Sequence, residues 1–293
     1  MMKRIFISAS VLSLAALPVI GQESDTDKVK DTAKSTFYGK LQNFVAGFGE
    51  SLEGDRLKHL DLSLVEEDWV VGGEATAVIG LGEEDGRATF SQLSASRVDG
   101  RTTANIGLGV RQLTEDETAL YGGNVFYDHE FSAKHARVGI GLEYLTASGS
   151  LRANHYMRSS GEKTYRGIKE KAMTGTDVKY SYAFDARYKP VVAYRAFQWK
   201  GDGGYKVKGG EASVKLSFSD QVSMVLSRRD DDKSKAESKA RLTYSIAFAK
   251  LAGEENAGAS NAKSVRNMLY VPVERENRIR KTKVVLGVVM STF

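Results

Sequence analysis

Beyond residue 57, apolar side chains recur at every second position over most of this chain. Between Ala104 and Arg111, for example, Ala104, Ile106, Leu108 and Val110 alternate with polar residues and glycines. Successive side chains of a β-strand point to opposite faces, so each such run has one apolar and one polar face. The alternation therefore predicts an all-β fold built from amphipathic strands.

Turn signals separate the alternating runs. Asp85-Gly86 and Asp99-Gly100 are typical of tight hairpins, because both residue types accept the left-handed backbone that such turns need. Many runs are about ten residues long, which is the length of a tilted strand that crosses a bilayer. We predict twelve antiparallel strands, at 57–65, 73–82, 87–98, 102–112, 118–129, 135–146, 149–158, 173–184, 189–199, 209–218, 221–228 and 238–249.

The composition of the two faces favours a membrane barrel over a soluble β protein. The apolar faces carry aromatic residues toward strand ends, such as Tyr121, Tyr144 and Trp199, as aromatic girdles require. The mean hydropathy of -0.34 suits alternating strands and excludes a helical membrane bundle. Because lipid offers no partners to backbone groups, the strands must close on themselves. We predict a twelve-stranded transmembrane β-barrel, with an exported soluble sandwich or barrel as the alternative.

The N-terminal segment has the features of a secretory signal peptide. Lys3 and Arg4 precede an apolar stretch over 5–20, and the sequence becomes polar after Gly21, where we expect cleavage. Residues 22–56 have apolar positions at helical spacing and are expected to form a short periplasmic leader helix. Residues 1–21 hold two cations and no acids, so the net charge falls from +5 to +3, which is too mild to indicate nucleic-acid binding.

Several segments resemble the barrel of the inverse autotransporters, the intimin and invasin family. In chain order they are 90–93 (FSQL), 99–111 (DGRTTANIGLGVR), 121–128 (YGGNVFYD), 137–144 (RVGIGLEY), 154–158 (NHYMR) and 175–178 (GTDV). Residues 273–279 (VERENRI) are similar to the segment after that family's last barrel strand. The resemblance implies a barrel at 57–249 and a linker at 250–293 that returns through the pore to an extracellular passenger. Since only fourteen residues follow Ile279, we expect anchoring and translocation machinery without an adhesive passenger.

The polar faces of the matching strands are expected to line the pore. Mid-strand glycines would leave space for a threaded segment, and charged or amide side chains could pair with one another or bond to the linker backbone. The alternative is that any narrow barrel fills its interior with such residues. The predicted lumen-facing positions are Asn105, Gly107, Gly109, Arg111, Gly122, Asn124, Asp128, Arg137, Gly139, Gly141, Glu143, Asn154 and Arg158.

The last part of the chain allows two interpretations. In one, 266–274 and 280–293 form the final barrel hairpin, because an apolar run there leads to the aromatic Phe293. In the other, which we favour, the last barrel strand is 238–249 and the rest is linker.

No motif indicates catalysis, a cofactor or a metal site. Gly80-Leu81-Gly82 before Glu83-Glu84-Asp85-Gly86 lacks the helix and the spacing of a nucleotide-binding loop and is interpreted as a hairpin turn. Asp230-Asp231-Asp232 is interpreted as a solvated hairpin tip rather than a calcium site. None of the four histidines has metal-ligand spacing: His59, His129, His135 and His155.

The expected location is the bacterial outer membrane. The expected partners are outer-membrane lipid, the barrel assembly machinery and periplasmic chaperones, with no nucleic acid and no cofactor. We predict a non-enzymatic anchor and export barrel of the inverse autotransporter type. A plain diffusion pore or structural outer-membrane protein is the alternative.

Overall fold

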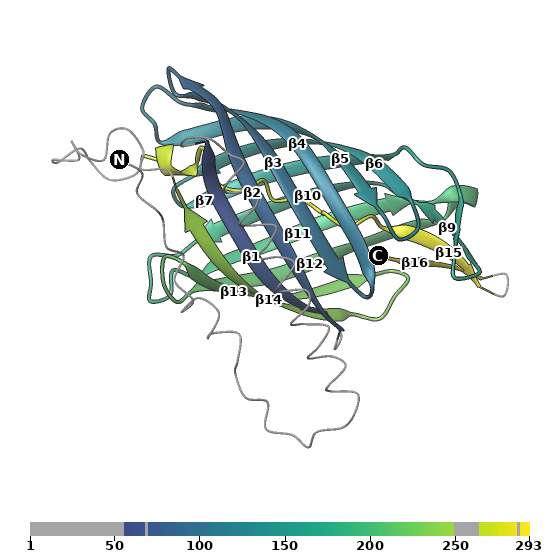
Figure 1. The fold of residues 1–293 in the computed structure, drawn as a ribbon. Coiled ribbons are helices and arrows are strands. Elements are labelled where there is room, and N and C mark those ends of the chain that lie inside the picture. The colour runs from purple at the N-terminus through teal and green to yellow at the C-terminus, as the bar shows by residue number, and fades with distance from the viewer. Residues whose placement is uncertain (1–55, 68–69, 249–263, 286–287) are drawn as a thin grey trace, which may run out of the picture. The chain divides into compact units, whose positions relative to one another are not determined.

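A closed antiparallel barrel of twelve strands forms the body of the protein (Figure 1). The computed structural model describes residues 56–67, 70–248, 264–285 and 288–293. The predicted signal peptide and leader helix therefore lie outside the described residues. The barrel strands are β1 (Leu57–Glu67), β2 (Val70–Glu84), β3 (Arg87–Val98), β4 (Arg101–Leu113), β5 (Ala119–Glu130), β6 (His135–Thr146), β7 (Gly149–Arg158), β10 (Thr174–Ala183), β11 (Val191–Lys200), β12 (Lys206–Ser217), β13 (Val222–Asp231) and β14 (Glu237–Ala247).

Each barrel strand pairs with its neighbour along the chain, and β1 closes the sheet against β14. All twelve strands lie where the alternation predicted them, with ends that differ by a few residues, so the predicted fold class is confirmed. Within the described ranges, no helix is long and apolar enough to cross a membrane.

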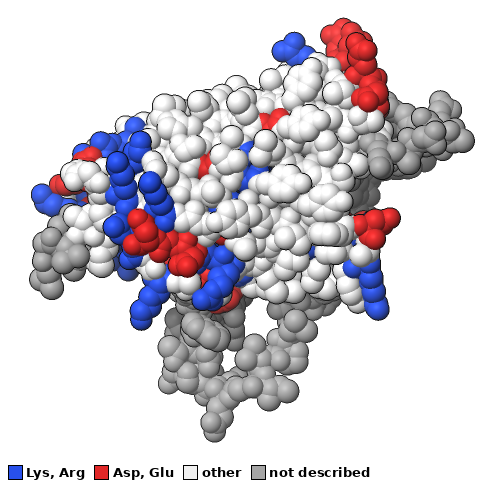
Figure 2. Space-filling model, turned by 180° about the vertical axis from the view of Figure 1, so that it is seen from behind, with Lys and Arg blue, Asp and Glu red and all other residues white. Residues whose placement is uncertain are grey.

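The two faces of the barrel differ as the alternation requires. Leu142 and Tyr180 are 70% and 57% exposed on the outside, whereas Arg111 and Arg137, on the inside, are fully buried. On the face shown in Figure 2, the middle of the outer surface is largely free of charged residues, which gather toward the two ends. Large apolar groups facing outward around a closed sheet fit a lipid environment and would be costly in water.

A second, smaller sheet lies outside the barrel and was not predicted. The segment 159–171, interpreted from sequence as a turn region, contains β8 (Lys163–Tyr165) and β9 (Ile168–Ala172). These strands join β15 (Lys281–Val285) and β16 (Val288–Thr292) in the order β16-β15-β9-β8. Three of these strands have five residues and one has three, too few to show the alternation that revealed the barrel.

The glycine-rich stretch over 80–86 leads into a hairpin turn, as interpreted from the sequence, but Gly80-Leu81-Gly82 precede the turn itself. These residues lie inside β2, at a point where the pairing register with β3 shifts between Gly80 and Gly82. The turn follows at Asp85 and Gly86, whose φ angles of 49° and 71° are left-handed. The glycines thus mark a β-bulge, which is a common role for glycine inside a strand.

Residues 264–280, called here the linker segment, run through the inside of the barrel (Figure 1, yellow). The segment begins near the 3-10 turn η5 (Arg266–Met268), at the mouth where β1 starts, and leaves at the opposite mouth to form β15. We call these the entry mouth and the exit mouth. The final-hairpin interpretation of 266–293 is wrong, because β1 and β14 close the barrel and β15 pairs with β9.

Candidate functional site: the pore and its linker segment

At the entry mouth, apolar residues and ion pairs hold the start of the linker segment. Leu269 and Val273 are buried in a cluster with Phe90 and other residues of β2 to β6. The Val265 amide donates to the Glu117 carbonyl at 2.8 Å. Arg266 pairs with Glu117 at 2.6 Å and with Glu83 at 3.0 Å. The hydrogen bonds from Arg266 and Ser264 lower the pKa of the Glu117 carboxyl.

Deeper in the pore, one buried arginine of the barrel binds the linker backbone. Arg111 donates through Nη1 to the carbonyls of Met268, Leu269 and Val271, at 3.1, 2.9 and 2.6 Å. Its Nε and Nη2 donate to the two carboxylate oxygens of Glu143 at 2.8 and 3.2 Å. The planar guanidinium thus binds a carboxylate on one side and backbone oxygens on the other, which an ammonium group could not do with the same geometry.

At mid-depth, Asp128 joins the barrel wall to the linker segment. Arg275 of the linker donates to its two oxygens at 2.7 and 2.8 Å, and Arg137 of the barrel donates to Oδ2 at 2.7 Å. Arg137 also donates to the Glu276 carbonyl at 2.6 Å, and Asn105 bonds both to Asp128 and to a linker carbonyl. The Asp128 and Arg275 side chains are 0% and 1% exposed, so this charge pair is removed from water.

Other barrel side chains satisfy the peptide groups of the extended linker. The Val273 amide donates to Gln92 Oε1 at 2.7 Å, and Gln92 Nε2 donates back to the Val273 carbonyl at 3.4 Å. The Glu276 amide donates to the Tyr156 hydroxyl at 2.8 Å. Asn154 donates to the Glu274 carbonyl at 3.4 Å. A backbone without strand partners inside the barrel needs such bonds, because unpaired buried peptide groups are costly.

At the exit mouth, three cations of the chain pair with acids at the ends of barrel strands. Arg278 pairs with Glu67 at 2.5 Å, Arg280 with Asp231 at 2.7 Å, and Lys281 with Glu130 at 2.5 Å. The Asp231 side chain is only 4% exposed. The interpretation of Asp230-Asp231-Asp232 as a solvated tip is therefore wrong at Asp231, which binds the linker. Within the described ranges, no group of acidic residues or histidines could hold a metal ion.

A buried charge cluster joins the exit mouth to the outer sheet. Arg101 donates to both Glu130 and Glu170 at 2.6 Å, and Lys281 completes the cluster from β15. Burial raises the pKa of the Glu170 carboxyl, but Arg101 and the nearby Lys281 and His135 outweigh it and bring the pKa to about 2. We ascribe the lowering mainly to Arg101, because His135 Nε2 lies 3.7 Å from Glu170, beyond hydrogen-bonding distance.

Charge complementarity runs along the whole linker segment. Each charged residue from Arg266 to Lys281 has an oppositely charged partner in the barrel. The pairs are Arg266 with Glu83 and Glu117, Glu274 with Arg152 and Lys179, Arg275 with Asp128, Glu276 with Arg195, Arg278 with Glu67, Arg280 with Asp231, and Lys281 with Glu130.

The pore-side glycines make room, but mostly for the barrel's own side chains. A Cβ built on Gly107 or Gly109 would lie 2.3 Å from an aromatic ring of a neighbouring strand, and one on Gly141 would lie 2.6 Å from two side-chain amides. Among the glycines predicted to face the lumen, only Gly139 meets the linker directly, with a built Cβ 2.8 Å from Arg275 Nη2. The space beside these glycines is therefore filled first by side chains of the barrel. The linker segment lies further toward the middle of the pore.

The structure brings some of the predicted lumen positions to the linker and places others behind them. Asn105, Arg111, Asp128, Arg137 and Asn154 bond to the linker segment, and Gly139 packs against it. The other seven do not bond to the linker. Gly122 and Glu143 pack on or bond to Arg111, Gly107 and Gly109 accommodate rings, Asn124 and Gly141 contact each other, and Arg158 pairs with Asp202 at the rim.

Several residues that hold the linker were missed by the sequence analysis. Gln92, Tyr156, Arg195, Glu67 and Glu130 lie on inward-facing positions of their strands. Alternation gives the face of each residue, but it does not say which inward residues meet the linker. The available signal was the charged run 274–278, whose alternating signs require barrel partners if the run is buried.

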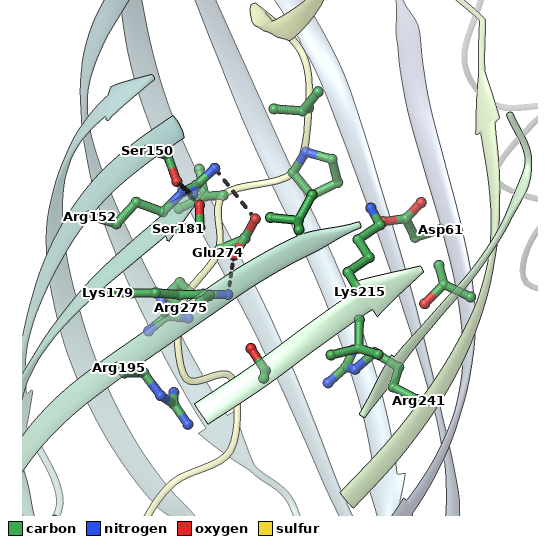
Figure 3. A pocket seen from close by; sticks show the side chains of 18 of the residues that line it. Asp61, Ser150, Arg152, Lys179, Ser181, Arg195, Lys215, Arg241, Glu274 and Arg275 are labelled. Atoms are coloured by element: carbon green, nitrogen blue, oxygen red, sulfur yellow. Dashed lines mark hydrogen bonds and ion pairs between the residues drawn. The ribbon is translucent and has the colours of Figure 1, made fainter. Parts of the chain in front are cut away.

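The linker segment fills one side of the lumen and leaves the other open. A cavity of about 500 Å³ lies between the linker and strands β1 and β10 to β14. Figure 3 shows Glu274 bonded toward Arg152 and Lys179 on one wall, with Asp61, Lys215 and Arg241 on the opposite wall. Toward the exit mouth a buried cluster packs together, formed by Tyr156, Met173, Phe197, Trp199 and Val207. Trp199 is only 1% exposed, so its predicted place in an outer aromatic girdle is wrong.

These features define a class: a membrane β-barrel whose pore holds a segment of its own chain. The family described as inverse autotransporter, beta-domain, matches residues 16–277. The chain belongs to this family, and it is an outer-membrane β-barrel of the inverse autotransporter type. The resemblance seen in the sequence is thereby confirmed, and the alternative of a plain diffusion pore is not favoured.

Individual relatives support the same assignment over shorter stretches. The chain is 38% identical over 93 residues to a putative attaching and effacing protein homolog of Escherichia coli K12, and 36% identical over 92 residues to invasin of Yersinia enterocolitica. These matches cover 31% and 30% of this chain, and 31% and 11% of the relatives. The chain thus matches less than a third of the length of either relative.

A solved structure shares the fold. A chain described under "Unveiling the Mechanism Behind the in-meso Crystallization of Membrane Proteins" superposes with a TM-score of 0.68 and 20% sequence identity. The superposition covers 78% of this chain and 99% of that chain. At this identity the likeness concerns the barrel architecture alone.

Proposed function

We propose that the barrel anchors a polypeptide in the outer membrane, with the linker segment as the part of that polypeptide that remains in the pore after export. The observation that carries this proposal is the complementarity of charge along residues 266–281. The entry mouth would face the periplasm and the exit mouth the cell exterior. The same proposal includes removal of a signal peptide near Gly21. It also includes insertion by the barrel assembly machinery with periplasmic chaperones, and a role without enzymatic activity.

The pairing of charges favours one register of the linker over its neighbours. If the segment moved by two residues so that Arg278 took the place of Glu276, Arg278 would face Arg195, which now pairs with Glu276 at 3.3 Å. Asp128 would then face Asn277 and lose its ion pair with Arg275. Buried like charges and unpaired carboxylates each cost several kcal/mol, roughly, so the shifted register is disfavoured. An anchor needs this property, because the linker must not slide under load.

The direction of the linker can be tested in intact cells. We would add an epitope tag after Phe293 and a second tag in the β2–β3 turn at Gly86, and treat the cells with a protease that cannot cross the outer membrane. The proposal expects loss of the first tag and protection of the second. Protection of the first tag and loss of the second would mean that the chain lies in the opposite orientation, and the proposal would be rejected.

Conductance separates an anchor from a diffusion pore. In planar bilayers the full chain is expected to show little current, and a variant that lacks residues 264–293 is expected to conduct, because it loses the segment that crosses the lumen. Heat-dependent gel mobility checks that the shortened barrel is folded. Equal conductance of the two folded proteins would favour the diffusion pore.

A further inference from the structure

Three lysines occupy one place on the outside of the barrel near the exit mouth. Lys200 ends β11, and Lys206 and Lys208 begin β12. Their chain neighbours Trp199 and Val207 are buried at 1% and 0% exposure, so the lysines point to the opposite, outward face, where all three are exposed. We call these three residues the lysine patch. Figure 2 shows Lys and Arg gathered at one end of the face in view, together with several Asp and Glu.

The three lysines lie close together on one face, and none of them forms an ion pair with an acid within the described part of the chain. Lys200 and Lys206 are direct cross-strand partners, and Lys208 lies opposite Gln198 one pair further along on the same face. Like charges directly opposite on a sheet are destabilising. Among the described residues, none forms an ion pair with these three side chains. The nearest exposed carboxylate is that of Asp232, whose Oδ1 accepts a hydrogen bond from the Lys208 amide at 2.8 Å, and Asp230 lies opposite Gly210, two residues beyond Lys208.

Cations are not spread evenly around this rim. On β3 to β7, the outward positions nearest the exit mouth include one arginine, Arg97, together with uncharged or aromatic residues such as Thr102, Phe131 and Met157. On β11 to β13 and at the residue after β13 they are the lysine patch, Arg228, Asp230 and Asp232. The excess of positive charge on one side indicates an anionic partner at that side, since solubility or general membrane contact would not require a local concentration.

Polar groups and small residues lie directly below the patch toward the middle of the membrane. Gln198 and the Tyr194 hydroxyl have no hydrogen-bond partner among the described residues. The hydroxyl lies over Gly210, where a built Cβ would be 2.1 Å from its oxygen. The next outward pairs are Ala196 with Gly210 and Tyr194 with Ala212, and below them Val192 faces Val214. The strip thus runs from cations, through hydrogen-bonding groups, to apolar residues.

We propose that this strip binds a phosphorylated glycolipid of the outer leaflet, of the lipid A type. The lysine patch would bind the phosphates, Gln198 and the Tyr194 hydroxyl would bond to sugar oxygens, and acyl chains would lie along β11 and β12 below Gly210. A glycolipid with two phosphates fits three clustered cations and two free hydrogen-bonding groups better than a phospholipid with one phosphate. The proposal rests on the proposed function to the extent that it places the exit mouth in the outer leaflet.

The test measures lipid binding to the full, detergent-solubilised chain by native mass spectrometry. Lipid A is titrated against wild type, the triple variant Lys200→Gln/Lys206→Gln/Lys208→Gln, and the matched control Arg97→Gln, each checked for heat-dependent gel mobility. A lysine beside anionic head groups contributes about fivefold in affinity. We therefore expect the triple variant to bind at least about tenfold more weakly and Arg97→Gln to bind within about twofold of wild type. Phosphatidylglycerol at equal concentration should not displace lipid A.

Three outcomes would overturn the proposal: wild-type affinity of the triple variant, an equal loss in Arg97→Gln, or displacement by phosphatidylglycerol. If the triple variant does not fold, Asp230→Asn decides, because removal of one of the two exposed carboxylates beside the patch should tighten lipid A binding two- to fivefold. Unchanged affinity of Asp230→Asn counts against the patch. This assay does not depend on the linker or on orientation in cells. If lipid A binds through the patch but the tag after Phe293 is inaccessible, only the proposed function is rejected. If the tag is accessible but lipid A does not bind through the patch, only this inference is rejected.

Discussion

The ion pair between Asp128 and Arg275 is the contact whose loss should loosen the linker segment most selectively. In Arg275→Met, the side chain keeps much of its length but loses two hydrogen bonds to the Asp128 carboxylate, of 2.7 and 2.8 Å. Asp128 keeps its bonds from Arg137 and Asn105, so the barrel wall stays paired. At about 1.5 kcal/mol net for each charge-assisted bond, the linker should open more easily by about 3 kcal/mol.

Hydrogen exchange reports this opening at the amides that the barrel protects. The Val273 amide is held by Gln92 and the Glu276 amide by Tyr156, so both exchange only when the linker leaves its site. A cost of about 3 kcal/mol corresponds to exchange about 150-fold faster in the peptide that contains these residues. Amides of β4 and β5 should exchange at the wild-type rate, because the barrel itself is unchanged.

Lys179→Met is the matched control. It also removes a linker ion pair, with Glu274 at 2.6 Å, but these side chains are 26% and 47% exposed. Exposed pairs contribute about 0–1 kcal/mol, so exchange should rise less than about fivefold. The reasoning about burial would be refuted if both variants accelerated exchange equally, or if Arg275→Met changed it less than fivefold.

Three further predictions concern other parts of the site. Gly107→Ala should destabilise the barrel by about 1–3 kcal/mol in urea unfolding, because its Cβ would lie 2.3 Å from an aromatic ring, whereas Gly161→Ala, with no atom within 4 Å, should be neutral. Arg111→Lys should expose the linker to protease, and Arg111→Met more so, because Lys keeps the charge but cannot reach Glu143 and three carbonyls together. Because the pKa of Glu170 is about 2, below its ordinary 4.5, its contribution to holding β15 on β9 is complete above pH 4.5 and is lost as the pH falls toward 2. Exchange of the β15 amides, corrected for intrinsic rates, should rise over that range in wild type and lack this step in Glu170→Gln.

The barrel could be predicted from sequence because its information is local and repeated. Each strand from β1 to β14 that belongs to the barrel carries its own alternation, and tight turns such as Asp99-Gly100 separate the runs. The outer sheet carries no such signal. β9 has five residues, and its pairing with β15 joins positions more than a hundred residues apart, such as Ala172 and Lys281. Such a pairing depends on where the chain leaves the pore, and the local sequence of β9 does not contain that information.

The site was predicted by face but not by contact. Inward orientation followed from alternation, and resemblance drew attention to Arg111, Asp128 and Arg137. Which of these would touch the linker depends on its path and register, and neither is encoded in the strands alone. The rings that fill the space beside Gly107 and Gly109 illustrate the limit, since the glycines indicate that space is needed but not what occupies it.

Charge suits this linker better than apolar packing would, for a reason that concerns register more than stability. Buried ion pairs add little net stability, because desolvation offsets their attraction, but a wrong partner is costly. If the segment moved so that Glu276 took the place of Arg278, it would face Glu67, and Asp128 would face Val273. An apolar linker in the same pore would find nearly equal packing at several positions. Charges of both signs let a chain pass through a polar lumen that keeps a cavity of about 500 Å³ beside it, and still stop at one place.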